Sequence, residues 1–363
     1  MSELYVGLMS GTSLDGVDAV LADFGHGKPR LLAHNHSAFP PALQAELTAL
    51  NHPGNDELAR AARAANDLAR IYAACVQALL AQCTVAASAI AAIGCHGQTV
   101  RHQPAVGYTL QLVNGSLLAE LTDIDVVCDF RGRDVAAGGQ GAPLVPAFHH
   151  AAFASAARHR VIVNIGGIAN ITDLPPAANV TGFDCGPGNL LLDAWTQRHL
   201  RQPFDRDGAW AHSGAASADL LAHLLADEYF RRAPPKSSGR ETFNLAWLEK
   251  QLKGTEKPAD VAATLLALTA GTIYQAIEKF CVGAGEVYLC GGGARNVALV
   301  KLLAAQLAPR QIAATDVIGV NAEHVEALAF AWLARQTMHA QTGNLPAVTG
   351  ARGARILGAI YRA

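Results

Sequence analysis

Near the N-terminus, an apolar run leads into a turn of glycine and small hydroxylated residues. Residues 10–16 read Ser-Gly-Thr-Ser-Leu-Asp-Gly, and a second apolar run begins directly after them. Glycine lets backbone N–H groups approach a ligand closely, and the hydroxyls of Thr12 and Ser13 add donors, so the turn suits a phosphate chain. No lysine lies in or near it. The phosphate charge then requires a metal, and we expect Mg²⁺ held by water and Asp15. An ordinary hairpin is the alternative for this segment alone.

Two further glycine turns follow. Residues 164–171 read strand, glycine pair and strand, and residues 290–296 read strand, three glycines and the start of a helix. We expect the first two turns to hold the phosphates of one nucleotide from both sides. The third suits adenine and ribose, with a helix N-terminus adding a favourable dipole. The predicted ATP-binding residues are Gly11, Thr12, Ser13, Leu14, Asp15, Gly16, Val17, Asp18, Gly166, Gly167, Asn170, Gly291, Gly292, Gly293 and Asn296.

One carboxylate stands at the end of an apolar run. Asp184 follows the apolar run 180–183 and is followed by Gly186, Pro187 and Gly188. A strand end followed by glycines predicts that this side chain faces a cleft between two domains. Capping of the helix expected from about Asn189 is the structural alternative.

Length and composition limit the class of protein. A chain of 363 residues predicts two domains, and 51% hydrophobic against 16% charged residues excludes disorder. A net charge of −2 argues against a nucleic-acid partner. We find no apolar run of the ~18–20 residues that a membrane span needs, and no features of a signal peptide. Seven cysteines without a CxxC pair indicate thiols in a reducing compartment. A cytoplasmic protein is therefore expected, and its apolar composition suggests a homodimer.

The two halves of the chain predict nearly the same order of elements. Strands are expected at 4–9, 17–24, 30–39, 90–95, 109–113 and 126–128, and then at 161–165, 169–173, 180–184, 286–290 and 311–315. Helices are expected up to about 50 and at 55–83, 116–121, 190–199 and 323–339, with another opening at 291–296. This alternation predicts a duplicated α/β fold, with mixed sheets flanked by helices. We place the domains at 1–130 and 131–363, with a tail that returns to the first.

These turns and several longer motifs carry a resemblance over essentially the whole chain. The motifs are residues 7–16, 94–99, 129–134, 136–146, 183–189 and 290–296. They resemble the anhydro-N-acetylmuramic acid kinases, a family within the superfamily of sugar kinases, heat-shock ATPases and actin. The resemblance implies two ribonuclease-H-like (actin-like ATPase) domains and an ATP- and Mg²⁺-dependent reaction in peptidoglycan recycling. Water opens the 1,6-bridge of the anhydro amino sugar at C1, and the freed O6 takes the γ-phosphoryl group. Asp184 would be the base.

The remaining candidates concern the sugar. His96 and Gln98 are predicted to bind sugar hydroxyls, although a histidine satisfied at a strand end is the alternative for His96. Arg131 and Asp134 are predicted to bind the substrate at the hinge between the domains, where the Arg131 guanidinium would meet the transferring phosphoryl group or the lactyl carboxylate. An ion pair between the domains is the alternative for both residues. Weaker candidates are Glu326, which a solvated helix face also explains, and Lys236 and Arg240 in a loop expected to be exposed.

Two other functions stay open for a chain with these turns. An ordinary sugar kinase would phosphorylate an existing hydroxyl, with Asp184 deprotonating the sugar. An ATP-driven scaffold would instead hydrolyse ATP slowly without any sugar.

Overall fold

The computed structural model describes residues 2–11, 13–240 and 242–363, so the predicted ATP-binding residue Thr12 lies outside the described residues. The chain divides into two compact units. Unit 1 is Met1–Ala152 together with His324–Ala363, and unit 2 is Phe153–Glu323. Unit 1 thus continues beyond the expected boundary at residue 130. The reason is aromatic packing within unit 1: the ring centroids of Phe130 and Phe330 lie 5.7 Å apart, and those of Phe148 and Trp332 lie 6.2 Å apart.

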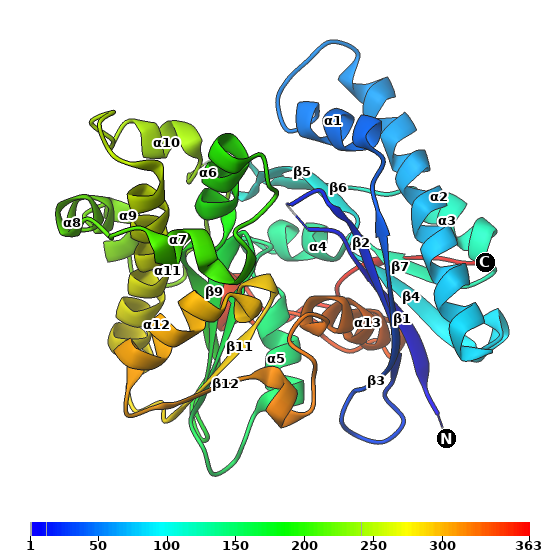
Figure 1. Ribbon diagram of the computed structural model, residues 1–363. Coiled ribbons are helices and arrows are strands. Elements are labelled where there is room, and N and C mark those ends of the chain that lie inside the picture. Colours follow the sequence, from blue (N-terminus) through cyan, green and yellow to red (C-terminus); the bar gives the residue numbers. More distant parts are fainter. Residues whose placement is uncertain (1, 12, 241) are drawn as a thin grey trace. The chain divides into compact units, whose positions relative to one another are not determined.

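Unit 1 is built on a mixed six-stranded sheet with the order β13-β7-β4-β1-β2-β3 (Figure 1). Its strands are β1 (Leu4–Met9), β2 (Gly16–Asp23), β3 (Arg30–Ala38), β4 (Ile90–Cys95), β7 (Val126–Cys128) and β13 (Ala359–Tyr361). The first three form an antiparallel meander, and β4 and β7 continue the sheet in parallel with β1. The tail strand β13 pairs antiparallel with β7. A separate antiparallel pair consists of β5 (Gln98–Gln103) and β6 (Tyr108–Leu112).

Helices cover both faces of this sheet. They are α1 (Pro41–Ala49), α2 (Glu57–Cys83), α3 (Gly115–Thr122), α4 (Phe130–Ala136), α5 (Val145–Phe153), α13 (Val325–Met338) and α14 (Pro346–Thr349), with 3₁₀ turns at Ala87–Ala89 and Pro104–Val106. In α2, Leu68, Tyr72, Val76 and Leu79 recur every three or four residues and are fully buried. They share one hydrophobic cluster with Val6 of β1.

Helix α13 packs against β1 and β4 (Figure 1). Gly7 and Gly94 are cross-strand neighbours on these strands. A Cβ added at Gly7 would lie 1.9 Å from the carbonyl oxygen of Ala327, and one at Gly94 would lie 2.0 Å from that of Phe330. The helix backbone can approach the sheet this closely only because both positions are glycine.

Unit 2 contains a mixed five-stranded sheet with the order β10-β9-β8-β11-β12. Its strands are β8 (Arg160–Ile165), β9 (Ile168–Leu174), β10 (Thr181–Pro187), β11 (Glu286–Cys290) and β12 (Gln311–Ala314). Its helices are α6 (Leu190–Leu200), α7 (Ala209–Ser213), α8 (Ala218–Leu225), α9 (Glu228–Arg231), α10 (Leu245–Glu249), α11 (Pro258–Phe280) and α12 (Val297–Leu307), with 3₁₀ turns at Arg206–Gly208, Gly292–Arg295 and Thr315–Ile318. Strands β8 to β10 form an antiparallel meander, and β11 and β12 follow in parallel with β8.

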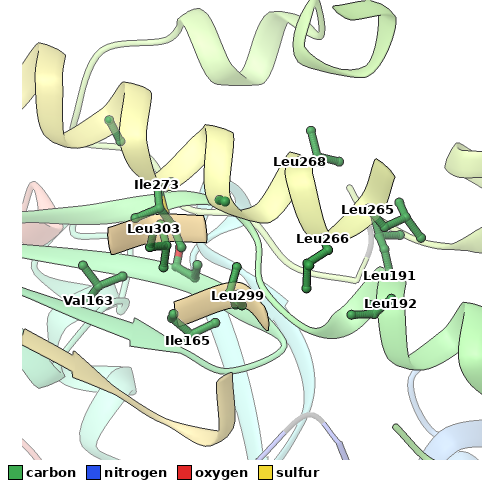
Figure 2. Close-up of a cluster of buried hydrophobic side chains, with 14 of the residues drawn as sticks. Val163, Ile165, Leu191, Leu192, Leu265, Leu266, Leu268, Ile273, Leu299 and Leu303 are labelled. Carbon is green, nitrogen blue, oxygen red and sulfur yellow. The ribbon is translucent and has the colours of Figure 1, made fainter. Parts of the chain in front are cut away.

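The core of unit 2 lies between its sheet and helices α11 and α12. Figure 2 shows Ile273 of α11 and Leu303 of α12 above Val163 of β8, and all three are fully buried. Among the described residues, α11 is the one helix that is long and apolar enough to cross a membrane. The sequence alone did not predict it as a candidate span, because no uninterrupted apolar run of that length was found. In its most apolar stretch, 72% of the residues are buried inside the protein. Such burial is typical of a core helix.

The two sheets have the same order of strands. In each unit, three antiparallel strands are followed by two parallel ones beside the first strand. This duplication confirms the predicted fold class of two ribonuclease-H-like, actin-like ATPase domains with mixed sheets flanked by helices. Apart from 3₁₀ turns, five elements of unit 1 were not expected from the sequence: β5, α4, α5, α14 and β13.

Candidate active site

The first glycine turn connects β1 to β2 in unit 1. Ser10 is buried, and its hydroxyl donates to the Gly97 carbonyl at 3.0 Å and lies 2.7 Å from the hydroxyl of Tyr72. Beyond it, the Leu14 N–H donates to the Gly11 carbonyl at 3.3 Å. The base of the turn is therefore anchored in the core, and its tip at residues 13 and 15 is exposed.

The carboxylates of this segment differ in their surroundings. Asp15 is exposed and accepts a hydrogen bond from the Ser13 hydroxyl at 2.7 Å. Asp18 already lies in β2, where its carboxylate is 3.0 Å from Nδ1 of His36. Gly16 and Val17 are buried in the same strand, so only their backbone groups are suited to contact a ligand.

His96 and Gln98 lie directly behind this turn and are 5% and 1% exposed. Nδ1 of His96 is 3.1 Å from the Ser10 carbonyl, and the Gln98 amide donates to the Gly11 carbonyl at 3.1 Å. Burial, with the nearby Arg131 charge, lowers the pKa of His96 to about 3. The Gln98 Oε1 atom is buried and has no hydrogen-bond partner among the described residues. It is thus an acceptor suited to a ligand hydroxyl or N–H group.

Arg131 joins this group from helix α4. Its Nε and Nη2 atoms lie 3.2 and 3.0 Å from Nε2 of His96, and Nη1 donates to the Gly141 carbonyl at 2.7 Å. The predicted residues Gly11, His96, Gln98 and Arg131 are therefore brought together at one edge of unit 1.

Asp134 has a different position from the one expected. Its carboxylate is fully buried and accepts hydrogen bonds from the Gly141 N–H at 2.8 Å, the Asn344 amide at 2.6 Å and the Thr349 hydroxyl at 2.8 Å. Both carboxylate oxygens already accept hydrogen bonds inside unit 1, so Asp134 is not suited to bind a sugar. These three partners all belong to unit 1, so they do not form the ion pair between domains that was the alternative for Asp134. In this structure Asp134 ties the loop after α4 to the C-terminal tail.

In unit 2, the glycine pair between β8 and β9 is bonded to the loop after β10. The N–H groups of Gly188 and Leu190 donate to the Gly167 carbonyl at 2.9 and 3.1 Å, and that of Asn189 donates to the Gly166 carbonyl at 2.9 Å. A Cβ at Gly188 would lie 2.3 Å from the Gly166 carbonyl oxygen. The predicted phosphate turn and the segment that carries Asp184 are thus fixed to each other.

Asp184 occupies one row of residues across the unit 2 sheet. It pairs with Asn170 of β9, which in turn pairs with Asn164 of β8. Directly opposite residues on neighbouring strands present their side chains on the same face. The Asn170 Oδ1 atom is buried without a hydrogen-bond partner among the described residues. The row therefore gathers a carboxylate and two amides beside the glycine pair.

A segment that follows helix α9 holds Asp184 in place. The Ser238 N–H donates to its Oδ2 atom at 2.9 Å, its own N–H donates to the Lys236 carbonyl at 3.1 Å, and the Tyr229 hydroxyl donates to its carbonyl at 2.7 Å. The side chain is only 7% exposed. Sequence reasoning missed the Ser238 contact, because a backbone donor 54 residues away leaves no signal in the pattern of residue types.

The expected exposure of the loop at residues 234–240 is wrong for Lys236, which is 6% exposed. Its ammonium group donates to the Tyr229 carbonyl at 3.2 Å and lies 4.8 Å from the centre of the Tyr229 ring and 5.8 Å from that of Phe183. Burial lowers the pKa of Lys236. Arg240 is exposed, and Glu326 is partly buried at the start of α13.

The third glycine run follows β11. The Gly291 N–H donates to the Ala322 carbonyl at 2.8 Å, and a 3₁₀ turn spans Gly292–Arg295. The α-helix expected to open within 291–296 instead begins at Val297, since Asn296 caps it by accepting from the Leu299 N–H at 3.0 Å. Asn296 is therefore occupied as a helix cap, and the glycines lie one turn before the helix N-terminus.

The described residues include no cluster of three or more His, Cys, Asp or Glu side chains able to hold a metal. Magnesium usually keeps several waters and binds one or two carboxylates together with substrate phosphates. The exposed Asp15 carboxylate beside the Ser13 hydroxyl fits such a magnesium site, in which one carboxylate, water and substrate phosphates are the ligands.

The duplicated sheet order defines the class of the protein. Glycine turns connect the first two strands of each unit, β1–β2 and β8–β9, and a third follows the fourth strand of unit 2. This is the architecture of the superfamily that includes sugar kinases, heat-shock ATPases and actin.

The comparisons with known proteins narrow the class to one family. The family model for anhydro-N-acetylmuramic acid kinase matches residues 3–363. A relative from Nitrosospira multiformis with that name is 56% identical over 361 residues, which cover 99% of each chain. Relatives with the same name from Nitrosomonas europaea and Variovorax paradoxus are each 55% identical, again over 99% of both chains. The chain belongs to the anhydro-N-acetylmuramic acid kinase family.

Proposed function

We propose that this protein is the ATP-dependent kinase that opens 1,6-anhydro-N-acetylmuramic acid with water and phosphorylates its O6 atom. The products are N-acetylmuramic acid 6-phosphate and ADP, and the reaction serves peptidoglycan recycling. The proposal rests on one observation above all. In a chain of this family, the buried Asp184 carboxylate lies in the middle of β10, accepts a hydrogen bond from the Ser238 N–H, and belongs to a segment that is bonded to the Gly166–Gly167 turn.

Asp184 acts as the general base in this proposal. It takes one proton from the attacking water while the water oxygen forms a bond to C1 of the sugar. The C1–O6 bond breaks, and its electron pair stays on O6. O6 then bonds to the γ-phosphorus of ATP, the bond from that phosphorus to the bridging oxygen breaks, and ADP leaves. A positioned base of this kind contributes about 10²–10⁴ in rate. The Ser238 N–H stabilises the charged form of the carboxylate and fixes its orientation.

The turn at residues 10–16 binds the phosphates in this proposal, through backbone N–H groups and the Ser13 hydroxyl. Asp15 would hold Mg²⁺, which would neutralise phosphate charge when bound. In unit 2, the Gly166–Gly167 turn contacts phosphate in this proposal, and the glycines at 291–293 contact the nucleoside. The absence of a lysine in the first turn makes the metal the main source of positive charge there.

Arg131 and Gln98 contact the sugar in this proposal. Arg131 presents a planar guanidinium suited to two-point binding of a carboxylate, and the lactyl group of the substrate carries one. The buried Oε1 atom of Gln98 accepts a hydrogen bond from a sugar hydroxyl. Asp134 takes no direct part, since both of its carboxylate oxygens already accept hydrogen bonds within unit 1.

A cytoplasmic location completes the proposal. All seven cysteines are free, and six of them are buried. Seven unpaired thiols are typical of a compartment that keeps thiols reduced.

The proposed reaction has a direct test. The protein is incubated with ATP, Mg²⁺ and the anhydro sugar in ¹⁸O-labelled water, and the products are analysed by mass spectrometry. We expect a ring-opened 6-phosphate that carries one ¹⁸O atom at C1, together with ADP. A phosphorylated sugar with its 1,6-bridge intact would instead indicate an ordinary sugar kinase. ATP hydrolysis that is independent of the sugar would indicate an ATP-driven scaffold.

A further inference from the structure

The imidazole of His96 is bonded through both ring nitrogens inside unit 1. Nδ1 is 3.1 Å from the carbonyl oxygen of Ser10, the residue directly before the phosphate turn. Nε2 is 3.2 and 3.0 Å from Nε and Nη2 of Arg131. The ring also packs on Phe330, with 4.7 Å between the ring centres. His96 therefore joins the phosphate turn to the guanidinium that we propose to bind the sugar.

The partners determine which nitrogen carries the proton. A carbonyl oxygen only accepts, so the nitrogen beside Ser10 must be the N–H donor. A guanidinium only donates, so the nitrogen beside Arg131 must be the lone-pair acceptor. This arrangement requires a neutral ring. The burial of His96 and the Arg131 charge keep it neutral, since together they lower its pKa to about 3.

A second acceptor completes the orientation of the guanidinium. Nη1 of Arg131 donates to the Gly141 carbonyl at 2.7 Å, and the Gly141 N–H is held by the buried Asp134 carboxylate at 2.8 Å. The Arg131 side chain is thus fixed on one edge by an imidazole and on another by a backbone carbonyl, both of them uncharged acceptors.

We infer that His96 is a positioning residue, which contacts no sugar hydroxyl itself but holds Arg131 at a fixed place relative to the phosphate turn. This inference rests on the proposed function, in which Arg131 binds the carboxylate of the sugar. It differs from the sequence-based prediction that His96 binds a hydroxyl, because both of its ring nitrogens are already occupied.

Two substitutions separate the two bonds of the ring. H96N places an amide where Nδ1 stands, so it can still donate to Ser10 but has no group that reaches Arg131. H96Q places an amide where Nε2 stands, so it can still accept from Arg131 but loses Ser10. We expect H96N to lower kcat/KM for the sugar about 10- to 100-fold, mainly through KM, as the loss of a hydrogen bond to a charged group typically does. For H96Q, the fold-loss in kcat/KM should be less than a third of the fold-loss in H96N.

A double-mutant cycle with R131A provides the decisive comparison. If His96 acts through Arg131, adding H96N to R131A should change kcat/KM less than twofold. If H96N and R131A lowered kcat/KM independently, so that their effects multiplied in the double variant, the inference would be overturned. Equal losses of kcat/KM in H96N and H96Q would overturn it as well. A readout independent of activity is the ¹⁵N NMR spectrum of the imidazole, which should show the neutral Nδ1–H form at neutral pH in the wild type. A protonated ring or the Nε2–H form would overturn the inference. Wild-type protein that shows this spectrum but no sugar phosphorylation would instead refute the proposed function.

Discussion

The buried carboxylate of Asp134 allows a sharp prediction about stability. It accepts hydrogen bonds from three neutral donors: the Gly141 N–H, the Asn344 amide and the Thr349 hydroxyl. In D134A all three donors lose their acceptor inside the protein. A buried donor without a partner costs about 1–3 kcal/mol. The Thr349 hydroxyl can rotate toward another acceptor, which leaves two donors unsatisfied, so we expect D134A to lower the free energy of unfolding by roughly 2–6 kcal/mol.

The D134N variant should lose less. Its amide oxygen can still accept from Asn344 and Thr349, but its NH₂ group then faces the Gly141 N–H, so two donors oppose each other. We expect a loss of about 1.5–3 kcal/mol, equivalent to one charge-assisted hydrogen bond. D67N is the matched control, because Asp67 is 59% exposed and pairs with Arg70 on the surface of α2. It should change stability by less than about 0.5 kcal/mol.

Urea unfolding followed by far-ultraviolet circular dichroism measures these differences, and hydrogen exchange localises them. Exchange should accelerate in residues 134–141 and 344–349 of D134A, while β8 to β10 of unit 2 stay protected. If D134A unfolded at the same urea concentration as D67N, Asp134 would not tie the tail to the loop after α4.

Two further predictions concern acid stability and the glycine contact in unit 2. Burial lowers the pKa of His96, His102 and His149 to about 3, 4 and 3. The unfolded chain therefore binds more protons than the folded one below about pH 6.5, and stability should fall as the pH drops from there, by up to ~1.4 kcal/mol per pH unit for each ring. Urea unfolding midpoints measured from pH 7.5 to 5 test this pH dependence of stability. H149Q should remove about a third of the slope of stability against pH, and midpoints that did not change with pH would contradict the prediction. G188A places a methyl group 2.3 Å from the Gly166 carbonyl oxygen. The backbone at this contact must then move by about 1 Å, and a displacement of that size should lower kcat about 100-fold. G285A, whose Cβ meets no atom within 4 Å, should leave the rate unchanged, and equal rates in the two variants would refute the predicted coupling.

Much of the strand framework follows from local patterns. The ranges of β1, β4 and β7 agree with the sequence-based ones, because each is a short apolar run ended by glycine, polar residues or a turn. Helix α4 was missed because its seven residues include Gly132 and three charged side chains, which hide any helical periodicity. Its N-terminus carries a readable signal in hindsight, since Asp129 caps the Gly132 N–H at 3.3 Å.

The candidate site residues were chosen by motif, but the roles proposed for them depend on distant contacts. Lys236 lies in a Pro- and Ser-rich segment typical of an exposed loop, yet it is buried against Tyr229 and Phe183. The partners of Asp134 lie 7, 210 and 215 residues away along the chain. No periodicity or local motif reports contacts at such separations. Residue types therefore suggested candidates for the chemistry of the site, and the contacts made by each side chain came only from the fold.

The most direct test of the account is the turnover of D184N. The substitution keeps the size of the side chain but removes the base, so kcat should fall about 10²- to 10⁴-fold while the dissociation constant for ATP stays within twofold of the wild type. D173N is the matched control: Asp173 lies on β9 opposite Thr181, away from the row that contains Asp184, and bonds to His159 at 2.6 Å. It should keep kcat near the wild-type value. Wild-type turnover in D184N would contradict the assignment of Asp184 as the base that activates water.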